Sequence, residues 1–193
     1  MADQNLKNLR TDTAYLGTIS EYTSGRITRQ FESSSLSIAE ESIIRHYTGD
    51  SHEYLNSALR GQTDLSPALA EYSGLLNQAL EKLPNQGGTV YRGLGAAESA
   101  IARNWEVGEE ISFDAFTSAS RSIDEADEFR STDGVSLVIN SKSGKAVEAV
   151  SLSPNELELL FKSGSNFRVD QVTYRARFDE SDPLIREIVI TEI

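Results

Sequence analysis

The spacing of apolar residues changes once along this chain, and that change constrains the fold more than any other feature. Over residues 37–83, apolar side chains recur at helical spacing, as Leu69, Leu76 and Leu80 illustrate. After the turn-forming "NQGG" of residues 85–88, short apolar runs follow one another along the rest of the sequence. Helices followed by consecutive strands are typical of an α+β domain. We therefore predict N-terminal helices packed on a core of two antiparallel sheets.

Start and stop signals divide the helical half into three expected helices. Ser37 and Glu40 have the spacing of a capping box, which predicts a helix start, and Gly49 is expected to end that helix. A second helix is expected over residues 51–60. A third is expected over residues 66–83, where a serine cap is followed by proline in the first turn.

The second half is expected to contain two short helices, in "GAAESAIARNW" and "SIDEADEFR", among extended segments. Each of the remaining apolar runs has the length and the turn residues at its ends that are typical of a strand. The expected extended segments are "TVYRGL", "EISFDAFTSAS", "GVSLVINS", "KAVEAVSL", "ELELLF", "FRVDQVTYRARF" and "LIREIVITEI".

Length and composition limit the domain organisation and the possible partners. The 193 residues suffice for one domain, so we expect a polar arm or linker remnant over residues 1–35 and a single domain over residues 36–193. The net charge of -12 disfavours a nucleic-acid partner, because an acidic surface repels phosphates. No apolar run approaches the ~20 residues that span a bilayer, so no membrane partner is expected. There is no cysteine, and the two histidines lack metal-ligand spacing, so no metal site is expected.

Two glutamates in "SPNELELLF" are the first candidates for chemistry. If the strand includes both, Glu156 and Glu158 lie on one face, while Leu157, Leu159 and Phe161 point into the core. Considered alone, this alternation is explained fully by an ordinary strand with one solvated face, and that interpretation is favoured. A chemical role needs partners elsewhere in the chain.

Three other segments supply such partners. "VYRGL" places an arginine at a strand end, before a glycine that would let a ligand approach the backbone, and "FTSAS" places two hydroxyls on one strand face. The third segment, "ADEFR", ends a short helix. Each has an ordinary explanation when it stands alone: a surface arginine, a polar strand edge and an aromatic core residue. The residues singled out are Arg92, Gly93, Ser118, Ser120, Phe129 and Arg130.

Together and in this order, "VYRGL", "FTSAS" and "ELE" resemble the arginine, serine, glutamate signature of mono-ADP-ribosyltransferases of the bacterial-toxin and arginine-specific type. "EESIIRHYTGDSHEYLNSALRG" is similar to the family's N-terminal helices, and "ADEFR" to its loop over the nicotinamide end of NAD. The resemblance covers about residues 37–193. Two positions depart from the pattern: Ala119 stands where the family often has threonine, and Ser153 stands where many relatives have an aromatic residue in the turn that recognises the protein substrate.

The resemblance implies that NAD is the substrate, that no metal is needed, and that each motif has a role. Glu158 would stabilise an oxocarbenium-like transition state and hold the ribose 2′-hydroxyl. Arg92 would bind the phosphates, and Ser118 would hold Glu158 and the nicotinamide ribose in place. Phe129 would pack against the nicotinamide, and Arg130 could reach the diphosphate.

Glu156 then has a separate expected role. An arginine acceptor has a pKa above about 12 and is a poor nucleophile, so a second carboxylate could bind it and take its proton. In this family a glutamate at this position, rather than glutamine, implies arginine as the acceptor. We therefore expect an arginine-specific mono-ADP-ribosyltransferase.

The biological setting follows from the same resemblance. We expect a toxin, effector or phage enzyme that acts in the cytoplasm of a target or host cell, after delivery by a route that this chain does not encode. The expected partners are a target protein with an acceptor arginine and a cognate immunity or inhibitor protein. Two alternatives stay open: a NAD glycohydrolase, which passes ADP-ribose to water, and an inactive binding module with the same fold.

Overall fold

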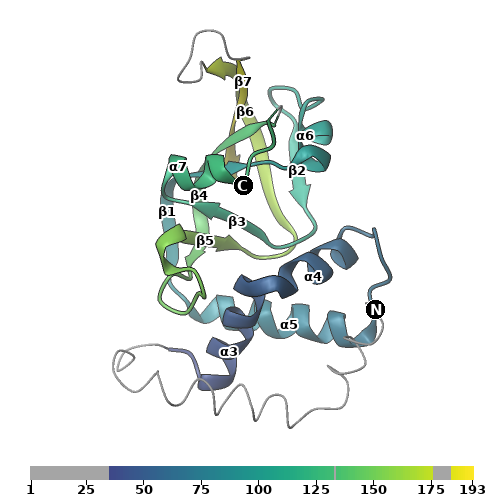
Figure 1. Cartoon of the computed structure of the whole chain (residues 1–193), viewed down its shortest axis with the longest axis vertical. Coiled ribbons are helices and arrows are strands. Elements are labelled where there is room, and N and C mark those ends of the chain that lie inside the picture. Colours follow the sequence, from purple (N-terminus) through teal and green to yellow (C-terminus); the bar gives the residue numbers. More distant parts are fainter. Residues whose placement is uncertain (1–34, 133, 176–183) are drawn as a thin grey trace. The chain divides into compact units, whose positions relative to one another are not determined.

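The structure is a computed structural model that describes residues 35–132, 134–175 and 184–193. The predicted polar arm falls almost wholly on residues 1–34, which lie outside the described residues. The chain divides into two compact units. The first holds the described residues up to Leu83 together with Val150–Leu152, and the second holds Pro84–Ala149 and Ser153–Ile193 (Figure 1).

The first unit is helical. Its elements are α3 (Ile38–His46), the π-helical turn η1 (Tyr47–Ser51), α4 (His52–Leu59) and α5 (Pro67–Lys82). The predicted capping box is confirmed, because the Ser37 backbone N–H donates to Glu40 Oε2 at 2.8 Å while the Ser37 hydroxyl accepts from the Glu40 N–H. Ser66 caps α5 by accepting from the Leu69 N–H, as the serine-proline pair predicts.

Gly49 separates α3 from α4. The sequence predicts a helix end at this residue, and the backbone does leave the helical conformation there, with φ -94° and ψ -146°. Gly49 lies within the π-helical turn η1, a geometry that is rare and mostly confined to single turns. The Thr48 hydroxyl of this turn accepts a hydrogen bond from the Leu152 N–H at 3.1 Å, which ties Val150–Leu152 to the helical unit.

His46 is expected to make the stability of the first unit depend on pH. Its Nδ1 lies 3.2 Å from Tyr72 Oη, and burial lowers the pKa of His46 from its ordinary value of 6.5. As pH falls below about 6.5, the unfolded chain takes up a proton that the folded chain still resists, so the free energy of unfolding should fall. Chemical unfolding at pH 7.5 and pH 5.5 would measure this loss.

The two histidines provide a matched comparison for that measurement. His46→Gln should remove a large part of the pH dependence, whereas the exposed His52→Gln should leave it in place. An unchanged pH dependence in His46→Gln would show that other groups control the acid sensitivity.

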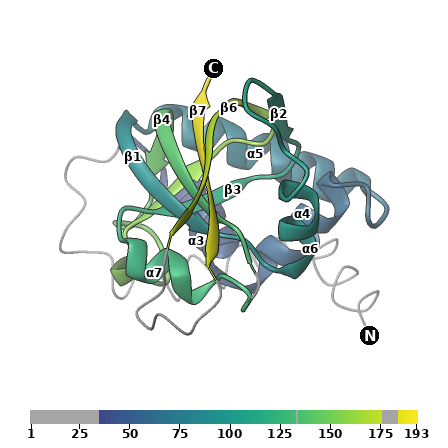
Figure 2. The same cartoon turned by 90° about the horizontal axis from the view of Figure 1, so that it is seen from above.

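The second unit is built on a seven-stranded sheet in the order β1-β3-β5-β4-β7-β6-β2, with an additional pairing between β1 and β4. Figure 2 shows β1, β4, β7 and β6 side by side. Two short helices, α6 and α7, and a 3₁₀ turn, η2, complete this unit. The bounds are β1 (Asn85–Gly93), α6 (Ala96–Ala102), β2 (Glu110–Phe113), β3 (Thr117–Ser120), α7 (Ile123–Glu128), β4 (Ser136–Ala146), η2 (Pro154–Glu156), β5 (Glu158–Phe161), β6 (Ser165–Arg175) and β7 (Ile185–Glu192).

The α+β class is confirmed, and the sheet differs from the expectation in its detail. "GVSLVINS" and the start of "KAVEAVSL" were expected as two strands, but they form the single long strand β4. Because β4 is long, it pairs with β1 along most of its length, pairs with β7 from Ser136 to Asn140, and reaches β5 through Lys145 and Ala146. The strands therefore form one hydrogen-bonded network rather than two separate sheets. The network is mixed, because β4 and β7 run parallel.

The pairings of β1, β3, β5 and β4 close on themselves. β3 lies between β1 and β5, β5 pairs with β4, and β4 pairs back with β1. The apolar core of this unit lies against these strands and includes the T-shaped contact of Phe161 with Phe167, with ring centroids 5.3 Å apart. None of the helices that the structure describes is long and apolar enough to cross a membrane.

Candidate active site

Glu158 is the most deeply buried of the candidate carboxylates. It is the first residue of β5, it lies opposite Ser120 of β3, and it is 6% exposed. Its backbone carbonyl accepts a hydrogen bond from the Val147 N–H at 3.1 Å, which fixes the start of the strand. The Glu158 carboxylate is therefore held at a fixed place, next to the strand that carries Ser118 and Ser120.

The prediction that Glu156 and Glu158 share one strand face is wrong. Glu156 ends the 3₁₀ turn η2, and the strand begins only at Glu158. Between them Leu157 adopts the left-handed conformation, with φ 49° and ψ 44°, and it is 41% exposed rather than packed in the core. Pro154 favours the turn, because its fixed φ suits the first helical position. Left-handed backbone at a non-glycine residue costs about 1–3 kcal/mol and is concentrated at functional sites.

Ser120 holds this strained turn in place. Its hydroxyl donates to the Glu156 carbonyl at 2.7 Å and accepts from the Ser122 N–H at 2.9 Å. Ser120 is also buried. The Ser120 hydroxyl, which was predicted to bind NAD, is therefore hydrogen-bonded to the backbone. It joins the turn that contains Glu156, the glutamate turn, to the start of α7.

Ser118 differs from Ser120 in its hydrogen bonding. Its backbone carbonyl accepts from Arg92 Nη1 at 2.7 Å, and its Cα lies opposite Leu160 of β5. Its side chain is half-buried, and within the described ranges the Ser118 hydroxyl forms no hydrogen bond. Of the two serines, Ser118 is the one with a hydroxyl that can serve a ligand.

Two groups of the second unit bind the Arg92 guanidinium. Its Nη2 lies 3.0 Å from both carboxylate oxygens of Glu98 in α6, while its Nη1 donates to the Ser118 carbonyl. The Arg92 side chain is 18% exposed, so the ordinary explanation of a solvated surface arginine is wrong. Five N–H groups are available on a guanidinium, so the group keeps donors for a ligand after these three contacts.

Glu98 is a site residue that the sequence analysis missed. Its position in the first turn of a predicted helix gave no reason to connect it with the arginine of the preceding strand. The contact forms because the short link from β1 to α6 returns the helix start to the end of the strand. A charge-paired Arg92 is fixed in orientation, which suits a group that must present its donors to a polar ligand.

Gly93 lies where the chain packs too closely for any side chain. A Cβ at this position would lie 2.2 Å from the Ala126 carbonyl oxygen and 2.7 Å from Arg130 Cβ. The absence of a side chain therefore lets α7 and the residues after it rest on the end of β1. The space that a Gly93 side chain would occupy is filled by α7 and Arg130, and the approach of a ligand to the Gly93 backbone stays a prediction.

Phe129 and Arg130 lie at the end of α7 and differ in the exposure of their side chains. Phe129 is 62% exposed, so the alternative that it packs in the core is wrong. The Arg130 side chain is only 3% exposed. It lies against Asp127 and donates to the carbonyls of Ser131 and Thr132. Arg130 is thus bonded to its own loop, and its contact with a diphosphate stays a prediction.

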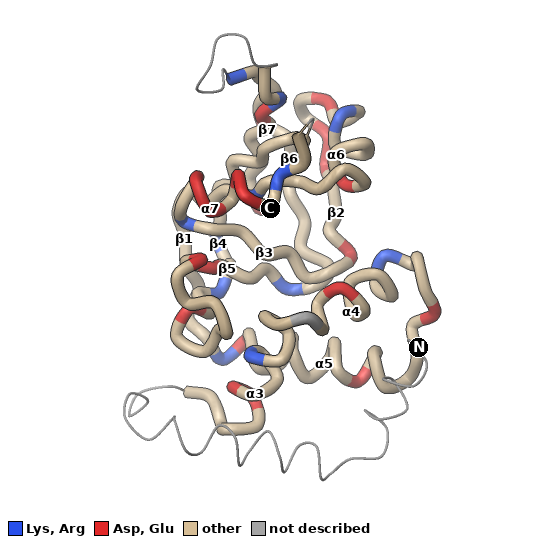
Figure 3. The backbone as a smooth tube through the Cα atoms, in the orientation of Figure 1, with Lys and Arg blue, Asp and Glu red and all other residues tan. Residues whose placement is uncertain are grey.

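The charge around this site is acidic on one side. Red segments mark most of α7 in Figure 3, where Asp124, Glu125, Asp127 and Glu128 follow one another. In the part of the chain that the structure describes, no group of three or more His, Cys, Asp or Glu side chains could hold a metal ion.

Comparison with known families shows which family this chain belongs to. The family model for the ADP-ribosyltransferase exoenzyme matches residues 23–192. This chain belongs to the ADP-ribosyltransferase exoenzyme family. The resemblance drawn from "VYRGL", "FTSAS" and "ELE" is therefore confirmed at the level of the family.

Two relatives from this family carry names that describe an activity. The chain is 33% identical over 128 residues to the NAD(+)–protein-arginine ADP-ribosyltransferase Tre1 of Serratia proteamaculans. The aligned residues cover 66% of this chain and 27% of Tre1. It is 37% identical over 127 residues to the putative NAD(+)–arginine ADP-ribosyltransferase Mav of Mycobacterium avium, over 65% of this chain and 15% of Mav. The chain thus spans no more than about a quarter of the length of these curated relatives.

Solved structures share the fold of this family member. Exoenzyme S from Pseudomonas aeruginosa, in a complex with human 14-3-3 protein beta and bound to carba-NAD, superposes with a TM-score of 0.70 at 22% identity, covering 100% of this chain and 89% of that one. The ADP-ribosyltransferase Vis in complex with agmatine gives a TM-score of 0.68 at 21% identity, over 93% and 83% of the two chains.

Proposed function

We propose that this family member transfers ADP-ribose from NAD to an arginine side chain of a target protein and releases nicotinamide. The observation that carries the proposal is the hydrogen-bonded assembly of the three motifs in one unit. Arg92 is bonded to the Ser118 carbonyl, Ser120 lies opposite Glu158, and the Ser120 hydroxyl holds the carbonyl of Glu156. The names of Tre1 and Mav support arginine as the acceptor, and so does the agmatine complex of Vis, because agmatine carries a guanidinium group.

The proposed chemistry breaks the bond between the ribose C1′ and the nicotinamide nitrogen. The electron pair of that bond leaves with nicotinamide, which becomes neutral, and positive charge develops on the ribose. Glu158 is nearly buried, and a fixed carboxylate in a site with little water stabilises such charge strongly. Arg92, already oriented by Glu98, would bind the polar part of NAD, and the free Ser118 hydroxyl would bind the ribose.

The second half of the proposed reaction belongs to Glu156. A guanidinium nitrogen attacks C1′ and must lose a proton, which a carboxylate beside the acceptor can accept. Glu156 is half-buried and stands on a turn ahead of the strand, so it can meet an acceptor that approaches from solvent. The products are ADP-ribosyl arginine, nicotinamide and a proton. The enzyme is then a glycosyl-type transferase, because it moves the ribosyl group from one nitrogen to another.

The setting of the reaction follows as part of the same proposal. The enzyme would act as a secreted toxin or effector in the cytoplasm of a target or host cell, and a cognate immunity or inhibitor protein would protect its producer. With a net charge of -12, the chain would favour basic faces on both its target and its inhibitor.

A labelled-NAD assay tests the proposed function. The protein is incubated with NAD labelled in its ADP-ribose, with and without agmatine and with a cell lysate. Label on arginine residues and on agmatine supports the proposal. Free ADP-ribose alone would identify a NAD glycohydrolase, and the absence of any turnover would identify an inactive binding module.

Arg92→Lys should weaken NAD binding by about tenfold or more, because a lysine cannot reproduce the planar fork of donors. In this structure the loss is compounded, since one ammonium would have to replace contacts to the Ser118 carbonyl, to Glu98 and to the ligand. Calorimetric titration with NAD measures the effect. Arg168→Lys on the exposed part of β6 is the control, and equal affinities in both variants would remove Arg92 from the NAD site.

A further inference from the structure

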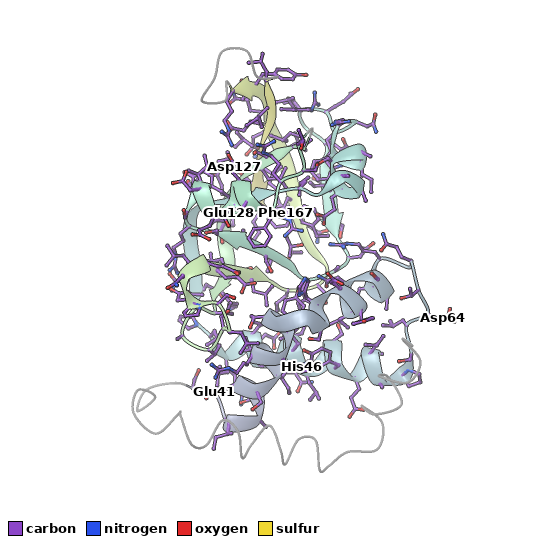
Figure 4. All side chains as sticks on the ribbon, viewed as in Figure 1. Glu41, His46, Asp64, Asp127, Glu128 and Phe167 are labelled. Atoms are coloured by element: carbon purple, nitrogen blue, oxygen red, sulfur yellow. The ribbon has the colours of Figure 1, made fainter. Side chains whose placement is uncertain are left out.

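Asp127 is the one acidic residue of α7 for which the structure shows a set of strong bonds to the sheet. Figure 4 labels it on that helix. Its two carboxylate oxygens accept from Arg175 Nη2 at 2.8 and 2.6 Å, and Oδ1 also accepts from the Ser136 hydroxyl at 3.2 Å. Arg175 ends β6 and Ser136 begins β4, so one carboxylate ties α7 to two strands.

Arg175 extends this cluster to a third strand. Its Nε lies 3.1 Å from Glu187 Oε2 of β7, and its Nη2 is 3.3 Å from the Ser136 hydroxyl. Burial raises the pKa of Asp127, but the hydrogen bond and charge of Arg175, with the charge of Arg130, lower that pKa by more. The net pKa lies below the ordinary value, so the ion pair persists at neutral pH.

The cluster lies beside the residues proposed to bind NAD. Ser136 lies directly opposite Gly93 in the pairing of β4 with β1, and the next residue of β1 in that pairing is Arg92. The close fit at Gly93 shows that α7 rests on the backbone at this point, with the Ala126 carbonyl where a side chain would be. A shift of α7 would therefore displace the end of β1.

The other end of α7 is linked through Ser120 to the turn that contains Glu156. Ser122 caps the helix, and its N–H donates to the Ser120 hydroxyl, which in turn donates to the Glu156 carbonyl. The helix thus spans from the Arg92 side of the site to the Glu156 side. Its Ser122 end is joined to the turn through the Ser120 hydroxyl, and its Asp127 end is joined to the sheet.

We propose that Asp127 and Arg175 are positioning residues, which hold α7 against the end of β1 and so keep Arg92 oriented for NAD. The proposal rests on the proposed function, because it assumes that Arg92 contacts NAD. Neither residue touches the reacting atoms. Their loss should therefore weaken the use of NAD more than it slows the chemical step.

Asp127→Asn is the first test. The amide keeps the size of the side chain but removes the charge that binds Arg175, so the KM for NAD in the hydrolysis assay should rise by about tenfold, below the ~100-fold that a 1 Å misplacement can cost. The kcat should change by less than about threefold. NAD titration by calorimetry should show the same loss of affinity.

Asp170→Asn is the matched control for a general loss of stability. Asp170 lies on β6, the strand that ends at Arg175. Like Asp127 it pairs with an arginine, at 2.9 Å from Arg168, and its pKa is lowered by hydrogen bonds, the largest effect coming from Thr191. It lies toward the end of β6 that pairs with β2. Asp170→Asn should leave the KM for NAD unchanged, and the free energies of unfolding of both variants are measured beside it.

A double-mutant cycle tests whether the two residues act as a pair. Arg175→Gln should raise the KM like Asp127→Asn, and the double variant should be no worse than either, because the effects of coupled residues are not additive. Arg175→Lys retains the charge and should recover part of the affinity. If Asp127→Asn does not fold, the comparison of Arg175→Lys with Arg175→Gln still decides the question.

The outcomes separate this proposal from the proposed function. A wild-type protein that binds and hydrolyses NAD, with Asp127→Asn matching Asp170→Asn in KM, would overturn the positioning role alone. Additive effects in the double variant would also overturn it. A wild-type protein that does not bind NAD would overturn the proposed function itself.

Discussion

Replacing Glu158 with glutamine is expected to abolish both ADP-ribose transfer and NAD hydrolysis while the chain still folds. Glutamine has nearly the same volume, so the start of β5 can keep its place opposite Ser120. The variant lacks the negative charge that would stabilise the positive ribose in the transition state. Removal of one preorganised electrostatic group costs about 10²–10³ in rate, and we expect at least this loss.

Nicotinamide release measures the effect on both activities, and chemical unfolding checks the fold. Glu110→Gln is a suitable control, because Glu110 is also the first residue of a strand but is exposed. It should behave like the wild type. Near-normal hydrolysis in a folded Glu158→Gln protein would exclude Glu158 from the catalytic role.

Glu156→Gln is expected to separate the two activities. The variant loses the carboxylate that would bind and deprotonate the acceptor guanidinium, so transfer to arginine should fall by about 10²-fold or more, in the range of general-base catalysis. Glu158 is untouched, so slow hydrolysis of NAD by water should survive. The left-handed Leu157 between them supports this division, because it takes Glu156 off the strand that holds Glu158.

Two assays on one preparation decide between the roles: label on agmatine or protein, and free nicotinamide. A fall of both activities by the same factor would place Glu156 on the NAD half of the reaction. If neither activity falls, the acceptor is not an arginine held by this carboxylate.

The helical half of the fold was predictable because its determinants are local. The caps at Ser37 and Ser66 use side chains that lie within three residues of their partners, so the sequence carries the information directly. The change of period after Leu83 likewise marked the start of the strands. The motif residues were predictable only through the family resemblance, since each had an ordinary explanation when taken alone.

The errors in the candidate site have tertiary causes. The alternation around Glu156 suggested a strand, but Pro154 and the Ser120 hydroxyl stabilise a turn there. Gly93 is needed because α7 packs on it, and no spacing in the sequence reveals that contact. The same holds for the partner of Arg92 in α6, which is brought to the arginine only by the folded chain.

The closed pairing of β1, β3, β5 and β4 determines when the three motifs of a newly made chain can come together. Ribosomes supply Arg92 and Ser118 well before Glu158, and β4 also needs β7 as its parallel neighbour. Because non-local strand pairings form only after their loops have closed, the motifs cannot be aligned while β5 and β7 are still unmade. The proposed site of a nascent chain is therefore not assembled until β7 has left the ribosome, and the proposed use of NAD would begin only then.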